Sequence, residues 1–183
     1  MKTSILKVLL SVFILGNLSA LSANEMYVFQ KAKVKIDNKN ATLHIGTPVM
    51  VIKDVDDKNV LVELSGLAFG DKLYTTKTKS LLMATKEEGS FGKAEQSVKI
   101  QAVIEKGYLS KAPAEIWEEH EEFFYEMCTQ CHAAYQPKAH TMMEWDAILQ
   151  TMSGFAQLYP DENEYLLRFL KANSNDGFYP QKK

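Results

Sequence analysis

Two different patterns of hydrophobic and polar residues divide the chain. From about residue 27 to residue 105, short apolar runs alternate with polar positions and are separated by turn signals. The period of two expected of a half-buried β-strand is clearest in the first run, where lysines fill the odd positions. Its even, apolar positions are Val28, Ala32, Val34 and Ile36. The polar stretch at residues 56–59 lies between two β-branched runs and predicts a hairpin turn. Short strands and close turns predict a small SH3-like β-barrel.

Residues 86–97 are polar, contain two glycines and show no periodicity, so they predict a loop or a domain boundary. His44 lies within a strand pattern, and an ordinary strand histidine is the simplest interpretation of it. No group of residues typical of a catalytic site is found in this half of the chain.

From Pro113 onward the apolar residues recur at steps of three and four, which predicts helices. Pro113 suits a first helical position, and the many glutamates that follow favour a helix N-terminus and then a solvated face. A second helix is predicted after Thr141, which forms a capping box with Glu144. A third is predicted after Pro160, with Asp161 as its cap. The apolar face expected for the first helix contains Ile116, Trp117, His120, Phe123, Phe124 and Met127.

The first 23 residues have the layout of a secretory signal peptide: two lysines, a short apolar run and then small residues. The apolar run is too short to span a bilayer, which needs about 20 residues. We therefore expect a signal peptide at 1–23, a β domain at 24–107 and a helical domain at 108–183. The exported chain would carry 19 basic and 23 acidic residues, a formal charge of −4, which argues against a nucleic-acid partner.

The only two cysteines, Cys128 and Cys131, are followed directly by His132. A structural zinc site needs four ligands, and no second pair of cysteines or histidines follows. A thiol–disulfide oxidoreductase places its cysteines where a helix begins, whereas this pair comes at the end of an acidic helix. The spacing Cys-x-x-Cys-His is typical of covalent attachment of one c-type haem, with the histidine as proximal iron ligand. Export is consistent with this third interpretation.

The sequence offers several candidates for the sixth iron ligand. Met152 ends the apolar stripe of the second helix and is the favoured candidate. Methionine is also a common core residue, so Met142 and Met143 remain open as alternatives. His140 precedes the cap and is expected to be exposed. Pro137 is expected to offer its carbonyl to the imidazole of His132 and so to fix the ring.

Residues 113–175 resemble the C-terminal monohaem domain of the pentahaem c-type cytochromes that serve trimethylamine N-oxide reductases. The resemblance rests on the haem motif, on Trp117, Pro137, Trp145, Met152 and Glu164, and on the segment 167–170. The tetrahaem module that precedes this domain in those proteins is absent from this sequence. The resemblance implies a detached carrier, with a membrane-bound multihaem quinol dehydrogenase as donor and a periplasmic molybdenum N-oxide or S-oxide reductase as acceptor.

We therefore expect a periplasmic electron-transfer protein of anaerobic respiration, with one haem, no catalytic residues and no small-molecule substrate. Cys128 and Cys131 would hold the haem, and His132 and Met152 would bind the iron. The β domain would help to dock a partner. A haem-based ligand-binding or sensor protein is the main alternative, and an exported thiol–disulfide oxidoreductase is a weaker one.

Overall fold

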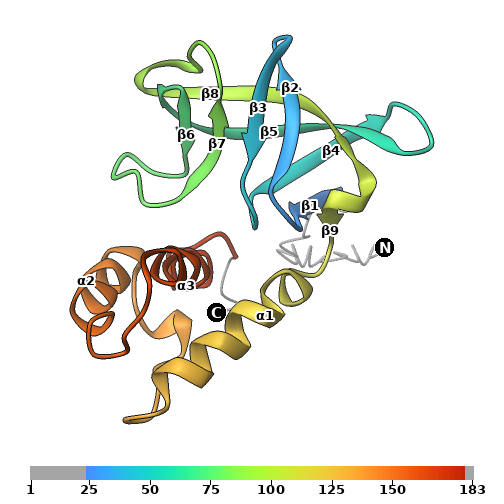
Figure 1. Cartoon of the computed structure of the whole chain (residues 1–183). Coiled ribbons are helices and arrows are strands. Elements are labelled where there is room, and N and C mark those ends of the chain that lie inside the picture. The colour runs from blue at the N-terminus through green and yellow to red at the C-terminus, as the bar shows by residue number, and fades with distance from the viewer. Residues whose placement is uncertain (1–23, 180–183) are drawn as a thin grey trace, which may run out of the picture.

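The computed structural model describes residues 24–179 and contains an all-β part followed by an all-α part (Figure 1). The two-part layout expected from the sequence is thereby confirmed. The predicted signal peptide at 1–23 lies outside the described residues. Among the residues described, no helix is long and apolar enough to cross a membrane.

The N-terminal part is a six-stranded β-barrel, and three further strands, β4, β1 and β9, extend the sheet beyond β5. The barrel closes because β5 pairs with β6 as well as with β8 and β4, so the ring runs β5-β6-β7-β3-β2-β8. The strands are β1 (Glu25–Val28), β2 (Ala32–Ile36), β3 (Lys39–Leu43), β4 (Pro48–Asp54), β5 (Asn59–Gly70), β6 (Lys72–Tyr74), β7 (Leu82–Lys86), β8 (Gly92–Glu105) and β9 (Leu109–Ser110).

The alternation predicted for the first strands is confirmed in β2, where buried and exposed residues alternate along its whole length. The predicted hairpin turn joins β4 to β5. Asp56 accepts hydrogen bonds at 2.8 Å from the backbone N–H groups of Lys58 and Asn59, and these contacts stabilise the turn.

The prediction of a loop at 86–97 is wrong for its second half, because β8 begins at Gly92 and pairs with the end of β5. Residues 93–97 are exposed, so this part of the strand has no buried face and no apolar alternation. Periodicity cannot detect such a strand, since the signal comes from burial on one side.

The C-terminal part contains α1 (Pro113–Cys128), α2 (Met142–Met152) and α3 (Pro160–Ala172), with 3₁₀ turns at Lys106–Tyr108 and Pro137–Ala139. Pro113 is the first residue of α1, as expected. The predicted capping box of α2 is confirmed: Glu144 accepts from the N–H of Thr141 at 2.7 Å, and Thr141 accepts from the N–H of Glu144 at 3.2 Å. The cap predicted for α3 is wrong, since Tyr159 is the N-cap and Asp161 lies in the first turn.

The described chain has two hydrophobic cores, one inside the barrel and one among the helices. The helical core also takes Tyr27 and Leu81 from the β part. The expected domain boundary at 107/108 falls within the first 3₁₀ turn, and β9 beyond it pairs with β1.

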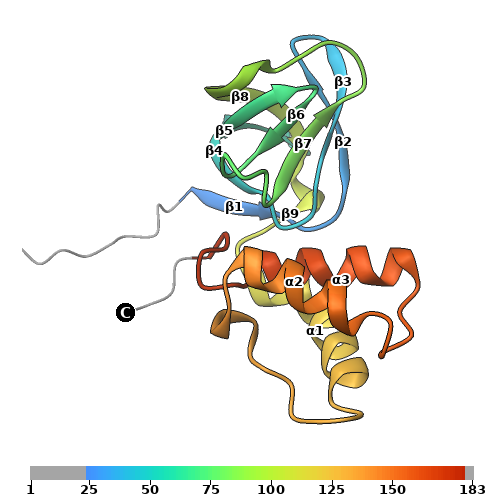
Figure 2. The same cartoon turned by 90° about the vertical axis from the view of Figure 1, so that its left-hand side faces the viewer.

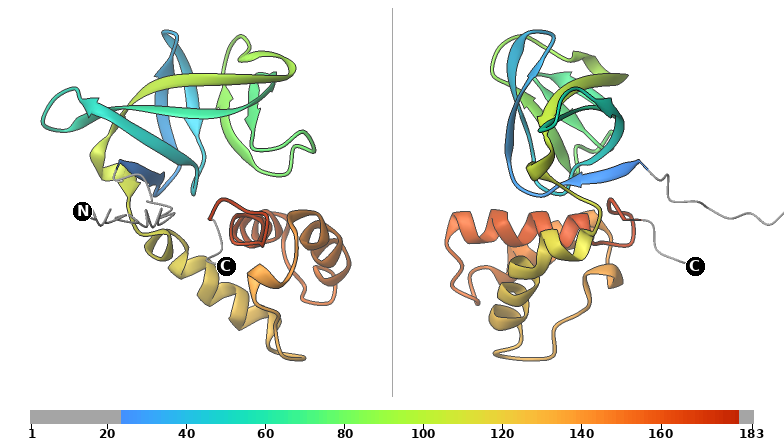
Figure 3. Two further views of the ribbon diagram at one scale, coloured as in Figure 1. Left: turned by 180° about the vertical axis from the view of Figure 1, so that it is seen from behind. Right: turned by 90° about the vertical axis from the view of Figure 1, so that its right-hand side faces the viewer.

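Arg168 of α3 connects the two parts by donating to the backbone carbonyls of Ile45 and Leu82. Gly46 makes a second close contact, with the indole of Trp117. Figures 2 and 3 show the helices as a layer below the barrel, with α1 running away from it. The C-terminal end of α1, which carries the cysteine motif, therefore lies at the far end of the molecule from the barrel (Figures 1 and 2).

Candidate haem-binding site

The cysteine motif begins at the last residue of α1. Cys128 closes the helix and is half-buried, whereas Cys131 and His132 follow in an exposed turn. The hydroxyl of Thr129 donates to the carbonyl of Tyr125 at 2.6 Å and ends the helix between the two cysteines. Both cysteines have free thiols in this structure.

The motif lines a cavity of about 470 Å³ between α1, α2 and the loop that follows α2. The walls are largely apolar: Phe124 from α1, and Trp145, Ile148, Leu149 and Met152 from α2. Cys128, Cys131 and His132 line the same cavity. The structure thus brings together all four residues that the sequence suggested for haem attachment and iron ligation.

The alternatives to Met152 do not line this cavity. The side chain of Met142 belongs to the helical core and is only 2% exposed, whereas that of Met143 is 74% exposed on the opposite side of the helix. His140 is half-buried rather than exposed as expected, with its ring edge-on to Trp145 at 4.9 Å. Met152 is half-buried and lines the cavity, so its position suits an iron ligand best.

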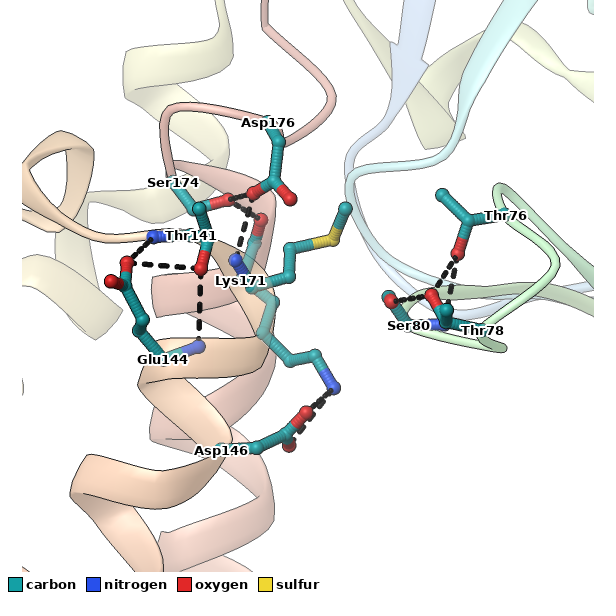
Figure 4. A network of polar contacts seen from close by, with 10 residues as sticks. Thr76, Thr78, Ser80, Thr141, Glu144, Asp146, Lys171, Ser174 and Asp176 are labelled. Carbon is teal, nitrogen blue, oxygen red and sulfur yellow. Dashed lines mark hydrogen bonds and ion pairs between the residues drawn. The ribbon is translucent and has the colours of Figure 1, made fainter.

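Polar contacts hold α2 in place next to α3 (Figure 4). Asp176 accepts from the N–H of Met142 at 2.7 Å and from the hydroxyl of Ser174 at 2.8 Å. Lys171 of α3 forms an ion pair with Asp146 of α2 at 2.8 Å. The same figure shows the capping box at the start of α2. These contacts fix the helix that presents Met152 to the cavity.

Contrary to the expectation from the sequence, the carbonyl of Pro137 does not contact the imidazole of His132. The carbonyl of Pro137 accepts a hydrogen bond from the indole N–H of Trp145 at 2.7 Å, so Pro137 anchors the loop to α2. His132 Nδ1 instead lies 2.9 Å from the carbonyl oxygen of Ala133. A carbonyl only accepts, so this contact requires the proton on Nδ1 and leaves the lone pair of Nε2 available for a metal.

Sequence analysis missed several residues that line the cavity. Met127 precedes Cys128 and was assigned only to the apolar face of α1. The loop after α2 contributes Phe155 and Tyr159, and the loop after the motif contributes Tyr135. No periodic pattern marks loop residues, but their aromatic character so close to the motif was a usable signal.

The environment of the thiols does not favour disulfide chemistry. Burial raises the pKa of the Cys128 thiol, whereas redox-active cysteines need a lowered thiol pKa. The zinc interpretation gains no support from the structure. Within residues 24–179 no group of three or more His, Cys, Asp and Glu side chains is placed to bind a metal ion.

The residues present fit a covalently bound haem. An apolar cavity bordered by two thiols, an imidazole with a free Nε2 and a thioether offers the attachment points, the iron ligands and a low-polarity environment. Cys128 and Cys131 would hold the haem, and His132 and Met152 would bind its iron.

Comparison with protein families supports this assignment. Residues 124–181 match the sequence model of the family described as dihaem cytochrome c, and this match supports a c-type cytochrome domain that carries haem for electron transfer. The matched segment covers less than half of the 183 residues, and the sequence contains one Cys-x-x-Cys-His motif. No curated protein and no solved structure matched the chain.

Proposed function

We propose that the protein is a periplasmic electron carrier with a single c-type haem, bound through Cys128 and Cys131 and ligated by His132 and Met152. The observation that supports this most strongly is the cavity at the end of α1, which all four residues line together. Bound haem supplies a one-electron iron couple. We further propose that the barrel belongs to the SH3-like type, given its short strands and tight turns.

The chain's own residues would set the properties of the site. Phe124, Ile148 and Leu149 form apolar walls that exclude water and favour the less charged, reduced state. A thioether ligand from Met152 also raises the reduction potential relative to a second histidine. The carbonyl of Ala133 holds the ring of His132 in one orientation. A raised potential suits a carrier that delivers electrons late in a respiratory chain.

The resemblance of residues 113–175 to the haem domain of the pentahaem cytochromes suggests the partners. We propose a membrane-bound multihaem quinol dehydrogenase as donor and a periplasmic molybdenum reductase of N-oxides or S-oxides as acceptor. The protein itself would perform no substrate chemistry.

A redox titration of the haem-loaded protein, followed by its absorption spectrum, tests this function. A carrier gives a reversible one-electron transition, stays low-spin in both states and resists carbon monoxide at neutral pH. Rapid binding of carbon monoxide by the reduced protein would instead favour the ligand-binding or sensor alternative, which needs an open or easily displaced sixth position.

A further inference from the structure

Charge is distributed very unevenly between the two parts of the molecule. Residues 113–179 contain 12 acidic and 3 basic residues, a formal charge of −9, whereas residues 24–112 contain 11 acidic and 14 basic residues, a formal charge of +3. Two of the three basic residues in the helical part are not available at its surface. Arg168 is engaged with barrel carbonyls, and Lys171 is paired with Asp146 with only 11% of its side chain exposed. The helical surface is therefore strongly negative.

Part of this acidic surface lies on α1, the helix that ends in the cysteine motif. Glu119, Glu122 and Glu126 are exposed and follow one another at helical spacing along α1 toward the cysteine motif. Glu126 directly precedes Met127, which lines the cavity. On the side of α3, Glu162 lines the cavity as well.

Helices α1 and α3 lie against each other near these glutamates. Phe123 of α1 and Tyr165 of α3 meet edge to face, with 6.0 Å between ring centroids. Glu119 is close enough to Tyr165 to help raise the pKa of that phenol, although burial is the larger cause. The negative field therefore spans both helices beside the cavity.

The mouth of the cavity is apolar and exposed. Tyr135, Phe155 and Tyr159 all line it, and 61%, 78% and 70% of their surfaces are accessible. Large exposed aromatic side chains that gather around one opening mark a contact surface, and aromatic residues are enriched at the centres of protein–protein interfaces.

We propose that this mouth, which lies within the negative field of the helical part, is the docking surface for a redox-partner protein whose own electron-exchange face is rich in lysine and arginine. The proposal rests on the proposed electron-carrier function. Opposite charges would steer the two proteins together, and the aromatic residues would exclude water at the centre of the contact. The C-terminal end of α1, where the cysteine motif begins, points away from the barrel (Figures 1 and 2).

The test measures electron exchange by stopped flow between the haem-loaded protein and mitochondrial cytochrome c, used as a lysine-rich probe, at increasing salt. We expect the second-order rate constant to fall by about tenfold or more as salt screens the attraction. Ferricyanide, a small anion, should show the opposite salt dependence. A rate with the lysine-rich probe that is indifferent to salt would overturn the proposal.

Two matched variants separate local charge from total charge. The first is Glu119→Gln/Glu122→Gln/Glu126→Gln, and the second is Asp57→Asn/Glu88→Gln/Glu105→Gln on the exposed barrel surface. Both remove three negative charges. We expect the α1 variant to lower the low-salt rate several-fold and the barrel variant to change it less than twofold. Equal effects of the two variants would show that only net charge matters and would contradict a docking surface at the mouth.

Phe155→Ala tests the apolar part of the surface. Since this side chain is 78% exposed, its removal should leave the fold intact, and we expect it to lower the rate without changing the salt dependence. An unchanged rate would remove Phe155 from the surface. The haem spectrum is recorded on every sample: haem-loaded protein without the expected salt dependence overturns the docking surface alone, whereas protein that binds no haem overturns the carrier function as well.

Discussion

Two methionines of α2, Met152 and Met143, differ in their position relative to the cavity, so substitutions can separate their roles. Met152 lines the cavity, whereas Met143 lies on the opposite face of α2 and is 74% exposed. We expect Met152→Ala to remove the sixth iron ligand, lower the reduction potential and allow carbon monoxide to bind. The absorption spectrum and a redox titration measure these effects.

Met143→Ala is the matched control and should leave the spectrum and the potential unchanged. If Met152→Ala kept a low-spin spectrum and the parental potential, Met152 would not be the ligand. Met127, which also lines the cavity, would then be the next candidate to substitute.

Two histidines of the described chain are held neutral by their surroundings. Burial lowers the pKa of His120 from the ordinary value of 6.5 to about 4, and Arg168 adds to the effect. Burial lowers the pKa of His44 to about 4 as well, with Arg168 again contributing. The unfolded chain binds protons at these residues near pH 6.5, before the folded chain does. The free energy of unfolding should therefore fall as the pH drops from about 6.5 to about 4.

Urea denaturation of the haem-loaded protein at several pH values measures this loss. His120→Gln cannot be protonated, so its free energy of unfolding should decline less between pH 7 and pH 5 than that of the parent. The comparison uses slopes, because the substitution also removes the stacking of His120 on Tyr165 at 3.6 Å. Parallel curves for the two proteins would argue that His120 titrates normally in the folded state.

The start of helix α2 depends on its capping box, which positions the helix that carries Met152. Thr141→Ala removes the side-chain acceptor for the N–H of Glu144 and should destabilise the protein by about 1 kcal/mol. Thr151→Ala, near the other end of α2, is the matched control. Its exposed hydroxyl only donates back to the carbonyl of Ala147, and alanine is a better helix former. Thermal unfolding should show a lower midpoint for the first variant and an equal or higher midpoint for the second.

The helix elements followed closely from the sequence, because caps and apolar spacing are local signals. Pro113 and the pair Thr141 and Glu144 mark helix starts through contacts within a few residues. The start of α3 was misplaced because the carboxylate that accepts the Tyr159 N–H at 2.8 Å is Glu162, and a tyrosine is not a typical cap residue. Residues 93–97 of β8 were missed because they have no buried face.

The sequence could predict only those site residues that are neighbours along the chain. Cys128, Cys131 and His132 are neighbours in sequence, and the chemistry of their spacing is local. The sequence favoured Met152 but left Met142 open, and setting Met142 aside required the rotation of α2 against α3, which depends on contacts such as that of Asp176 with Met142. The role of Arg168 in joining the two parts depends on residues more than 80 positions away, which no pattern within the chain reveals.

The contact between barrel and helices is tight at one point. Gly46 has a φ of +79°, and a Cβ placed on it would lie 2.3 Å from the indole of Trp117. Gly46→Ala should therefore destabilise the whole molecule by more than about 1 kcal/mol, through backbone strain and displacement of Trp117. Gly154→Ala is a control, since a Cβ there meets no atom within 4 Å. A Gly46→Ala variant that unfolds at the parental temperature would show that the two parts are not packed as described.

Because the barrel packs against the helices, deleting it is not a clean test of a role of the barrel in docking. The helical core includes Tyr27 and Leu81 from the β part, so deleting the barrel would expose apolar surface of the haem-binding part. A loss of electron transfer after deletion would then report instability as readily as lost docking. The barrel-surface variant Asp57→Asn/Glu88→Gln/Glu105→Gln of the intact chain avoids this ambiguity: the change of less than twofold expected of it would argue against docking through these positions, and a larger loss would favour it.

The central claim is that Cys128 and Cys131 hold one haem covalently. The most direct test is the intact mass of the protein made with a cytochrome c maturation system, measured after denaturation and alongside the Cys128→Ala/Cys131→Ala variant. We expect the parent to carry the added mass of one haem and no alkylatable thiol, and the variant to carry neither haem nor thiol. A parent without added mass, in which both thiols react with an alkylating reagent, would contradict the account.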